Sequence, residues 1–137
     1  GPPPEINLFN EKNNGETLLK LIENNLIKSA HDVSLGGIVT AVTKMCIKGK
    51  KGINIKKPKY LINEIEYLFA EDQGRYIVEI NKKDFKKVAD ILNKNAVHFD
   101  ELGTICENEL YINDKTKVTI DELSTSNKSW LIKYMSK

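Results

Sequence analysis

The sequence has almost no arginine and no long apolar run. Lysine and arginine together number 21, and Arg75 is the single arginine. This bias toward lysine lowers the weight of any one lysine cluster. No apolar run approaches the roughly 18 residues that a membrane helix needs. The net charge of +2 creates no strong field toward nucleic acid or a membrane. We therefore expect neither nucleic acid nor a membrane among the partners.

Cysteine is also scarce, because only Cys46 and Cys106 are present. Their separation matches no metal-ligand spacing, and we expect both to be buried, reduced thiols of a cytoplasmic protein. The sequence also lacks a Walker loop, a GxGxxG motif, an HExxH motif, a CxxC motif and a nucleophile elbow. These absences leave no predicted metal ligand and no predicted catalytic nucleophile.

The chain of 137 residues has the length of one domain. It contains no repeat and no obvious linker, so one domain is expected over residues 1–137. The polar, proline-rich start GPPPEINLFNEKNNGE is unlike a signal peptide, and residues 1–14 are expected to form an extended lead-in. The chain begins with Gly1 and has no methionine before Met45, which predicts a processed chain or a fragment of a longer one.

Hydrophobic periodicity predicts helices and strands that alternate along the chain. Helices are expected at 15–26, 38–49, 61–70, 84–93 and from a cap at Thr119 or Asp121 to Tyr134; strands are expected at 27–31, 52–55, 74–80, 99–106, 109–112 and 117–120. A turn at Asn113-Asp114 predicts a hairpin of the last two strands. The fold class is α+β, a single layered α/β domain with a mixed sheet. Trp130, on the last helix, is expected in the core or an interface.

The stretch SAHDVSLGG, residues 29–37, joins a predicted strand to a predicted helix. Gly36 and Gly37 would let the backbone approach another molecule, and the N–H groups of the helix start favour an anion. Ser34 can cap the helix or bond a phosphate oxygen. His31 can carry a proton near neutral pH, and Asp32 can orient it. The alternative is a purely structural capped turn, with His31 half-buried.

Two further clusters carry charge. The segment EDQGR, residues 71–75, places the lone arginine, Arg75, beside a glycine at a helix-to-strand junction. A guanidinium can clamp a carboxylate within the domain or contact a ligand or a neighbouring domain. Residues 48–59 hold the lysine-rich run KGKKGINIKKPK, which we interpret as a solvated loop because no aromatic or arginine interrupts it. His98 has no partner in sequence and is interpreted as structural.

The motifs SAHDVSLGGI, LFAEDQGRYIVEI and LGTI together resemble the C-terminal domain of the aminoimidazole-ribonucleotide-synthetase superfamily. Within it, the best match is the family of phosphoribosylformylglycinamidine synthases, in their synthetase (large) subunit. The lead-in GPPPEINL and the ending SWLIKYM are also similar to the last domain of that subunit. Many relatives have an acidic residue at the position of Leu35.

The resemblance implies an ATP-dependent ligase of purine biosynthesis that converts formylglycinamide ribonucleotide to the amidine with ammonia from glutamine. It implies ATP and Mg²⁺ bound mainly by preceding synthetase domains of the same protein, and a glutamine amidotransferase domain or subunit as a partner. This chain alone would be inactive. The apolar predicted faces also allow a homodimer of the isolated domain.

Under the same resemblance, residues 29–37 would line a cleft that holds the ribonucleotide substrate. His31 would position or polarise the substrate, Asp32 and Ser34 would assist, and the start of the helix at Gly36 and Gly37 would offer N–H donors to an anion. Arg75 would brace the site or a domain contact. The competing interpretations are a stand-alone α/β module that binds a nucleotide or a protein, and a sister synthetase of the same superfamily.

Overall fold

The computed structural model describes residues 6–56, 58, 60 and 63–136. Its elements run in the predicted order, α–β–α–β–α–β–α–β–β–β–α, with a short 3₁₀ turn added before the fourth helix. The chain divides into two compact units, Gly1–Ala41 with Ile65–Asp100, and Val42–Glu64 with Glu101–Lys137. The fold is mixed α/β, as predicted. The single domain over 1–137 stays a prediction, and each unit is described by itself.

The first unit is built on a two-stranded antiparallel ribbon. Strands β1 (Ser29–Asp32) and β3 (Tyr76–Glu79) pair in the register Ser29↔Glu79 to Asp32↔Tyr76. Two backbone bonds extend the pairing at its ends, from the N–H of Lys28 to the carbonyl of Glu79 and from the N–H of Val33 to the carbonyl of Arg75. The ribbon therefore places the middle of the SAHDVSLGG segment, at Asp32 and Val33, beside Arg75 at the end of the EDQGR segment.

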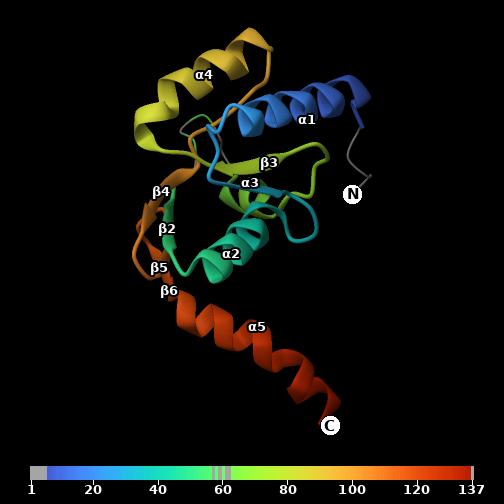
Figure 1. The fold of residues 1–137 in the computed structure, drawn as a ribbon. Helices are drawn as coiled ribbons and strands as arrows, with labels where there is room; N and C mark the ends of the chain where they lie inside the picture. Colours follow the sequence, from blue (N-terminus) through green and yellow to red (C-terminus); the bar gives the residue numbers. More distant parts are fainter. Residues whose placement is uncertain (1–5, 57, 59, 61–62, 137) are drawn as a thin grey trace. The chain divides into compact units, whose positions relative to one another are not determined.

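Helices α1 (Leu8–Glu23) and α4 (Phe85–Lys94) pack above this ribbon (Figure 1). Leu21, Leu26 and Val88 form the buried cluster between them, and partly buried Ile27, Ile80, Ile91 and Leu92 pack against it. The short turn η1 (Lys82–Asp84) leads into α4, and α3 (Glu64–Phe69) precedes β3. The predicted strands and the helix at 84–93 are thus confirmed; residues 61–62 of the helix predicted at 61–70 lie outside the described residues.

The first helix differs from its prediction. It was expected at 15–26 after an extended lead-in over 1–14, but α1 begins at Leu8, so the lead-in is wrong for residues 8–14. The side chain of Asn7 caps the helix by accepting a bond from the N–H of Asn10 at 3.0 Å. Leu8 and Phe9 are exposed, and the polar run that follows them has no helical periodicity, so the cap was the main signal in the sequence.

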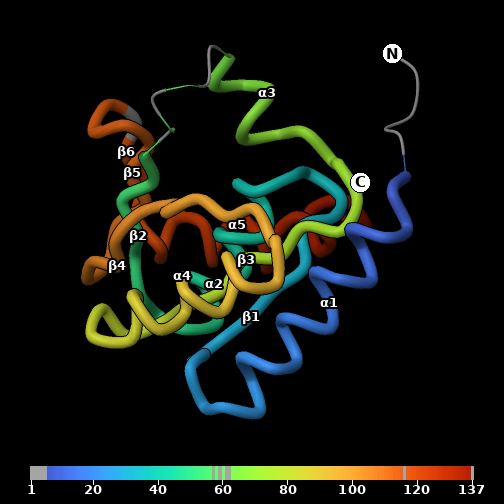
Figure 2. The backbone as a smooth tube through the Cα atoms, turned by 90° about the horizontal axis from the view of Figure 1, so that it is seen from above, coloured from blue at the N-terminus to red at the C-terminus, as the bar shows by residue number. Residues whose placement is uncertain are grey.

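The second unit contains a four-stranded mixed sheet in the order β4-β2-β5-β6 (Figures 1 and 2). The strands are β2 (Gly52–Ile55), β4 (Gly103–Cys106), β5 (Glu109–Ile112) and β6 (Thr116–Thr119). β2 pairs antiparallel with β4 and parallel with β5, and β5 and β6 form the predicted antiparallel hairpin. The mixed pairing is confirmed, although the strands form two sheets in place of one.

Two helices complete the secondary structure. Helix α2 (Gly37–Gly49) starts in the first unit and ends in the second, close to its predicted bounds. Helix α5 (Ile120–Met135) follows β6, and its cap is Thr119, one of the two predicted candidates. The hydroxyl of Thr119 accepts from the N–H of Glu122 at 3.2 Å, and the N–H of Thr119 donates to the Glu122 carboxylate at 2.9 Å.

The two cysteines differ in burial. Cys46, on α2, is buried, and burial raises the pKa of its thiol to about 11, with a smaller contribution from Cys106. Cys106, on β4, is only partly buried, so its predicted burial is wrong in degree. Both are free thiols. Among the described residues, no helix has the length and apolarity to cross a membrane.

We predict that Ile55→Ala destabilises the second unit strongly. Ile55 is fully buried on the central strand β2, so its truncation leaves a cavity that costs about 2–5 kcal/mol. Ile105→Ala, on the neighbouring strand β4, is the matched control, because Ile105 is 47% exposed. Urea unfolding should show a loss for the control of about 1 kcal/mol or less. Equal losses would contradict the assigned core.

Candidate functional site

The loop after β1 turns the chain sharply into α2. Val33 is buried, and the N–H of Gly37 donates to the carbonyl of Ser34 at 2.9 Å, which closes the turn. Gly36 and Gly37 have φ angles of +83° and +67°. Other residues adopt this left-handed region only with strain. The paired glycines are therefore required by the turn itself.

Gly37 also packs tightly against α3. A Cβ atom at Gly37 would lie 2.7 Å from the carbonyl oxygen of Leu68 and from backbone atoms of Phe69. A Cβ atom at Gly36 would lie 2.2 Å from the hydroxyl of Thr40. The close approach that these glycines allow is an approach of the chain to itself.

The start of α2 already has an anion beside it. The N–H of Gly36 donates to Oε1 of Glu71 at 2.7 Å. A carboxylate is stabilised near a helix N-terminus by the free N–H groups and the helix dipole. The N–H groups of Gly36 and Gly37 both bond within the chain, and the binding of a ligand anion at these two residues stays a prediction.

Helix α1 holds the EDQGR loop from the other side. The side-chain amide of Asn14 donates to the carbonyl of Gly74 at 3.0 Å. Gly74 has a φ of +69°, and a Cβ atom there would lie 2.8 Å from Cγ of Glu11. The loop is therefore clamped between the start of α2 and the first turns of α1.

Arg75 braces its own loop. Its Nη2 donates to the carbonyl of Ala70 and lies 3.5 Å from Oδ2 of Asp72. Its side chain is 29% exposed, so part of the guanidinium faces the adjoining pocket. The predicted internal clamp to a carboxylate is therefore observed, through one nitrogen.

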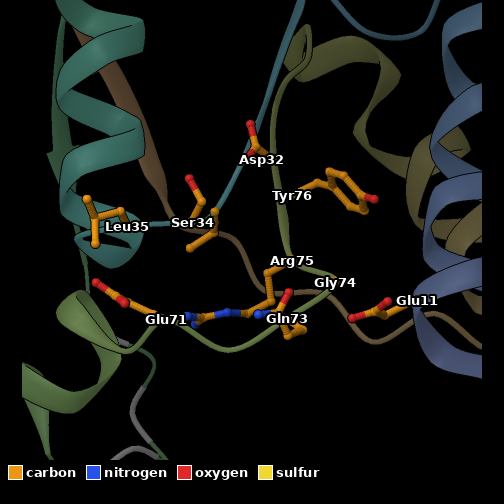
Figure 3. A pocket seen from close by; sticks show the side chains of 10 residues that line it. Glu11, Asp32, Ser34, Leu35, Glu71, Gln73, Gly74, Arg75 and Tyr76 are labelled. Atoms are coloured by element: carbon orange, nitrogen blue, oxygen red, sulfur yellow. The ribbon is translucent and has the colours of Figure 1, made fainter. Parts of the chain in front are cut away.

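These segments enclose a pocket of about 350 Å³ (Figure 3). It is lined by residues from α1, the loop after β1 and the EDQGR loop: Glu11, Asp32, Val33, Ser34, Leu35, Glu71, Gln73, Gly74, Arg75 and Tyr76. In Figure 3 the Arg75 side chain runs along the pocket toward Glu71, and Glu11 faces it from α1. All of these residues belong to the first unit.

The pocket lining is acidic. The carboxylates of Glu11, Asp32 and Glu71 line it together with one guanidinium, that of Arg75. Like charge disfavours a phosphate here, whereas carboxylates, the hydroxyl of Ser34 and the amide of Gln73 suit a ligand that offers hydroxyl or N–H donors. Among the described residues, no group of three or more His, Cys, Asp or Glu converges to hold a metal ion.

His31 lies outside the pocket lining. It is half-buried on β1, and its Nδ1 lies 2.6 Å from the carbonyl oxygen of Asp32 and 3.2 Å from the Asp32 carboxylate. Because a carbonyl oxygen only accepts, Nδ1 carries the proton and donates. His31 therefore contacts the pocket through Asp32.

The structure thus brings together three of the six predicted site residues in the pocket: Asp32, Ser34 and Arg75. Gly36 and His31 each contact a lining residue, Glu71 and Asp32 respectively, and Gly37 packs against α3. The sequence prediction did not include Glu11, because the helix that presents it was expected to begin later. Glu71 and Gln73 lie in the EDQGR segment, 71–75. Their place in that segment, beside Arg75, was the sequence signal that could have identified them.

Residues 2–115 match the family model described as AIR synthase related protein, C-terminal domain. The phosphoribosylformylglycinamidine synthase subunit PurL of Pelagibacter ubique is 67% identical over 135 residues, which cover 98% of this chain and 18% of that protein. The subunit of the same name from Bartonella bacilliformis is 35% identical over the same coverage. The chain thus spans 18% of the length of these curated relatives.

Solved structures share the fold. The structure described as T. maritima PurL complexed with FGAR has a TM-score of 0.72 at 24% identity, covering 83% of this chain and 21% of that one. A hydrogenase maturation protein, HypE, in complex with ATP has a TM-score of 0.61 at 12% identity, covering 77% of this chain and 38% of that one. At these identities the likeness concerns the fold alone.

We predict that Gly37→Ala lowers the free energy of unfolding by more than about 1 kcal/mol, because a Cβ there is strained by φ and meets the backbone of Leu68 and Phe69. The matched control is Gly49→Ala at the end of the same helix, where a Cβ meets nothing within 4 Å. Chemical denaturation of both variants measures the difference. A neutral Gly37→Ala would refute the packing role.

We also predict that Glu71→Ala costs about 1 kcal/mol of stability, the usual loss when a helix cap is removed. Glu71→Gln should retain most of it, since the amide oxygen can still accept from the N–H of Gly36. Thermal unfolding of the two variants side by side tests this. Equal destabilisation by both substitutions would exclude the hydrogen bond as the cause.

Proposed function

Because this chain belongs to the family of AIR synthase related proteins, C-terminal domain, we propose that it is the C-terminal domain of the synthetase subunit of a phosphoribosylformylglycinamidine synthase. The observation that carries the proposal is the 67% identity to the Pelagibacter subunit over 98% of this chain. The match covers nearly the whole chain and is not confined to one motif. A stand-alone binding module would not require it.

The proposed reaction joins ammonia to formylglycinamide ribonucleotide at the expense of ATP. The amide oxygen of the substrate attacks the γ-phosphorus of ATP, and ADP leaves. Ammonia, released from glutamine elsewhere in the enzyme, then adds to the activated carbon, and inorganic phosphate departs with the former amide oxygen to give the amidine. Such chemistry depends on orientation and charge stabilisation more than on a protein nucleophile.

In this scheme the pocket binds part of the ribonucleotide substrate. We infer that it contacts a region of that molecule rich in hydroxyl or N–H donors, because three carboxylates line it beside one guanidinium. The Asp32 carboxylate would accept from the ligand, the Ser34 hydroxyl would accept from it or donate to it, and Arg75 would hold the loop that carries Gln73. The substrate phosphate would be bound elsewhere in the full enzyme.

His31 would act as a positioning residue. Its Nδ1–H fixes the backbone of Asp32 at 2.6 Å and lies near the carboxylate at 3.2 Å. This contact restricts the rotamer of Asp32 at the mouth of the loop. His31 would thus influence substrate binding through Asp32 and not by direct contact.

We assign ATP and Mg²⁺ to other parts of the full enzyme. The described residues offer no cluster of metal ligands, so no step is placed on a metal held by this chain. When bound, Mg²⁺ would screen the phosphate charges of ATP. The implied partners are the remaining synthetase domains and a glutaminase domain or subunit, in the cytoplasm.

Substitutions in the complete enzyme test the pocket. We expect Asp32→Asn to lower kcat/KM for formylglycinamide ribonucleotide by about tenfold to a hundredfold, as for a lost charged hydrogen bond. Asp90→Asn, the same change at an exposed position on α4, is the control and should leave kcat/KM unchanged. Arg75→Lys should also lower kcat/KM, because lysine lacks the planar guanidinium that places Nη2 between the carbonyl of Ala70 and the carboxylate of Asp72. Wild-type kinetics in both site variants would exclude this pocket.

His31 allows a sharper test of positioning. His31→Ala should raise KM, whereas His31→Asn should restore much of the loss, because its amide N–H can replace Nδ1–H toward the carbonyl of Asp32. Steady-state kinetics and thermal unfolding of both variants separate this effect from misfolding. Equal defects in the two variants would contradict the role in orienting Asp32.

A further inference from the structure

The last two turns of α5 expose a cluster of large apolar side chains that the proposed function does not use. The cluster, here called the α5 patch, consists of Trp130, Leu131, Ile132, Tyr134 and Met135. Trp130, Tyr134 and Met135 are 59%, 73% and 76% exposed. Contiguous apolar surface of this kind marks an interaction site in soluble proteins. Trp130 was expected in the core or an interface, and its exposure leaves the interface.

Four of these five side chains share one face of the helix. At 3.6 residues per turn, positions 130, 131, 134 and 135 fall within one apolar stripe. The same stripe begins at the other end of α5 with Ile120, which is 4% exposed where α5 packs on β6, and with half-buried Leu123. Figure 1 shows α5 continuing from β6 away from the four strands. This face is interrupted by Asn127, and its apolar residues are covered at the start of α5 and bare at its end.

The opposite face of α5 is polar except at Ile132, which lies there and is 70% exposed. It carries Asp121, Glu122, Thr125, Ser129 and Lys133. A helix of 16 residues is marginal in water by itself and gains most of its stability from packing an amphipathic face. The C-terminal half of α5 has an apolar face, but none of the described residues of its unit covers that face.

We propose that the α5 patch packs against the part of the full-length polypeptide that lies outside these 137 residues. The curated relatives are more than five times longer than this chain, since it covers 18% of their length. The inference rests on the proposed function only in taking this chain as one domain of such a synthetase.

A covalently attached neighbour fits this patch better than a second copy of the chain. The patch spans six residues, whereas an independent interface usually recruits about 20–30 residues from each partner. A neighbour in the same polypeptide binds at a high effective concentration and can use a small contact. The patch would therefore anchor this domain onto the rest of its own chain.

Site-specific photo-cross-linking in the complete gene product tests the occupant. p-Benzoylphenylalanine replaces Tyr134 in one variant and Lys133, on the polar face of the same turn, in the control. After irradiation, mass spectrometry should identify peptides outside residues 1–137, within the same polypeptide, linked at least about tenfold more from position 134 than from position 133.

Every other outcome overturns the proposal. Cross-links between two polypeptides would assign the patch to a second copy or another subunit. Cross-links confined to residues 1–137, or equal or absent cross-linking at both positions, would remove the proposed neighbour, as would a gene product no longer than this chain. Amidation activity of the same preparation is measured separately, so that a failed function and a failed contact are distinguished.

Discussion

The contact between the Gly36-Gly37 turn and the segment Leu68–Glu71 is the constraint on which the pocket depends. Gly37 lies directly against the backbone at the end of α3, and Gly36 gives its N–H to Glu71. Since both φ angles are left-handed, no larger residue could keep this distance without strain. The contact sets the position of the EDQGR loop and so of Arg75, Gln73 and Glu71 around one cavity. The two sequence motifs are thus halves of one local structure.

This arrangement changes how Gly36 and Gly37 are interpreted. Glycines before a helix are often taken as a cradle for a ligand anion. Here the anion is a carboxylate of the chain, and the glycines admit a neighbouring segment of backbone. The chemistry of the pocket therefore comes from side chains around the turn, above all Asp32 and Ser34, and from the neighbouring loop. A net acidic lining makes hydroxyl and N–H groups the natural ligands.

Much of the fold was predictable because its elements have local signals. The periodicity of α2 and α4, the alternation of β3, the turn at Asn113-Asp114 and the cap at Thr119 each act within a few residues. The start of α1 was not predicted, because its main signal in the sequence is a single capping residue, Asn7. The division of the strands into two sheets, the parallel pairing of β2 with β5 and the contact between Glu11 and Gly74 depend on residues more than 40 positions apart, which no local pattern specifies. The sequence therefore predicted the two motifs that line the pocket, but not the contribution of Glu11 from α1.

The order of segments along the chain has a consequence for synthesis. Residues 65–100 of the first unit lie between the two segments of the second, Val42–Glu64 and Glu101–Lys137. During translation the first unit can be completed while β2 still lacks both of its partner strands, β4 and β5. A lone strand with two open edges invites pairing with other chains. The exposed lysines at 48, 50, 51 and 56 flank this strand, and charges in such positions oppose aggregation. We therefore expect the lysine-rich run to oppose aggregation of the nascent chain until the four-stranded sheet is complete.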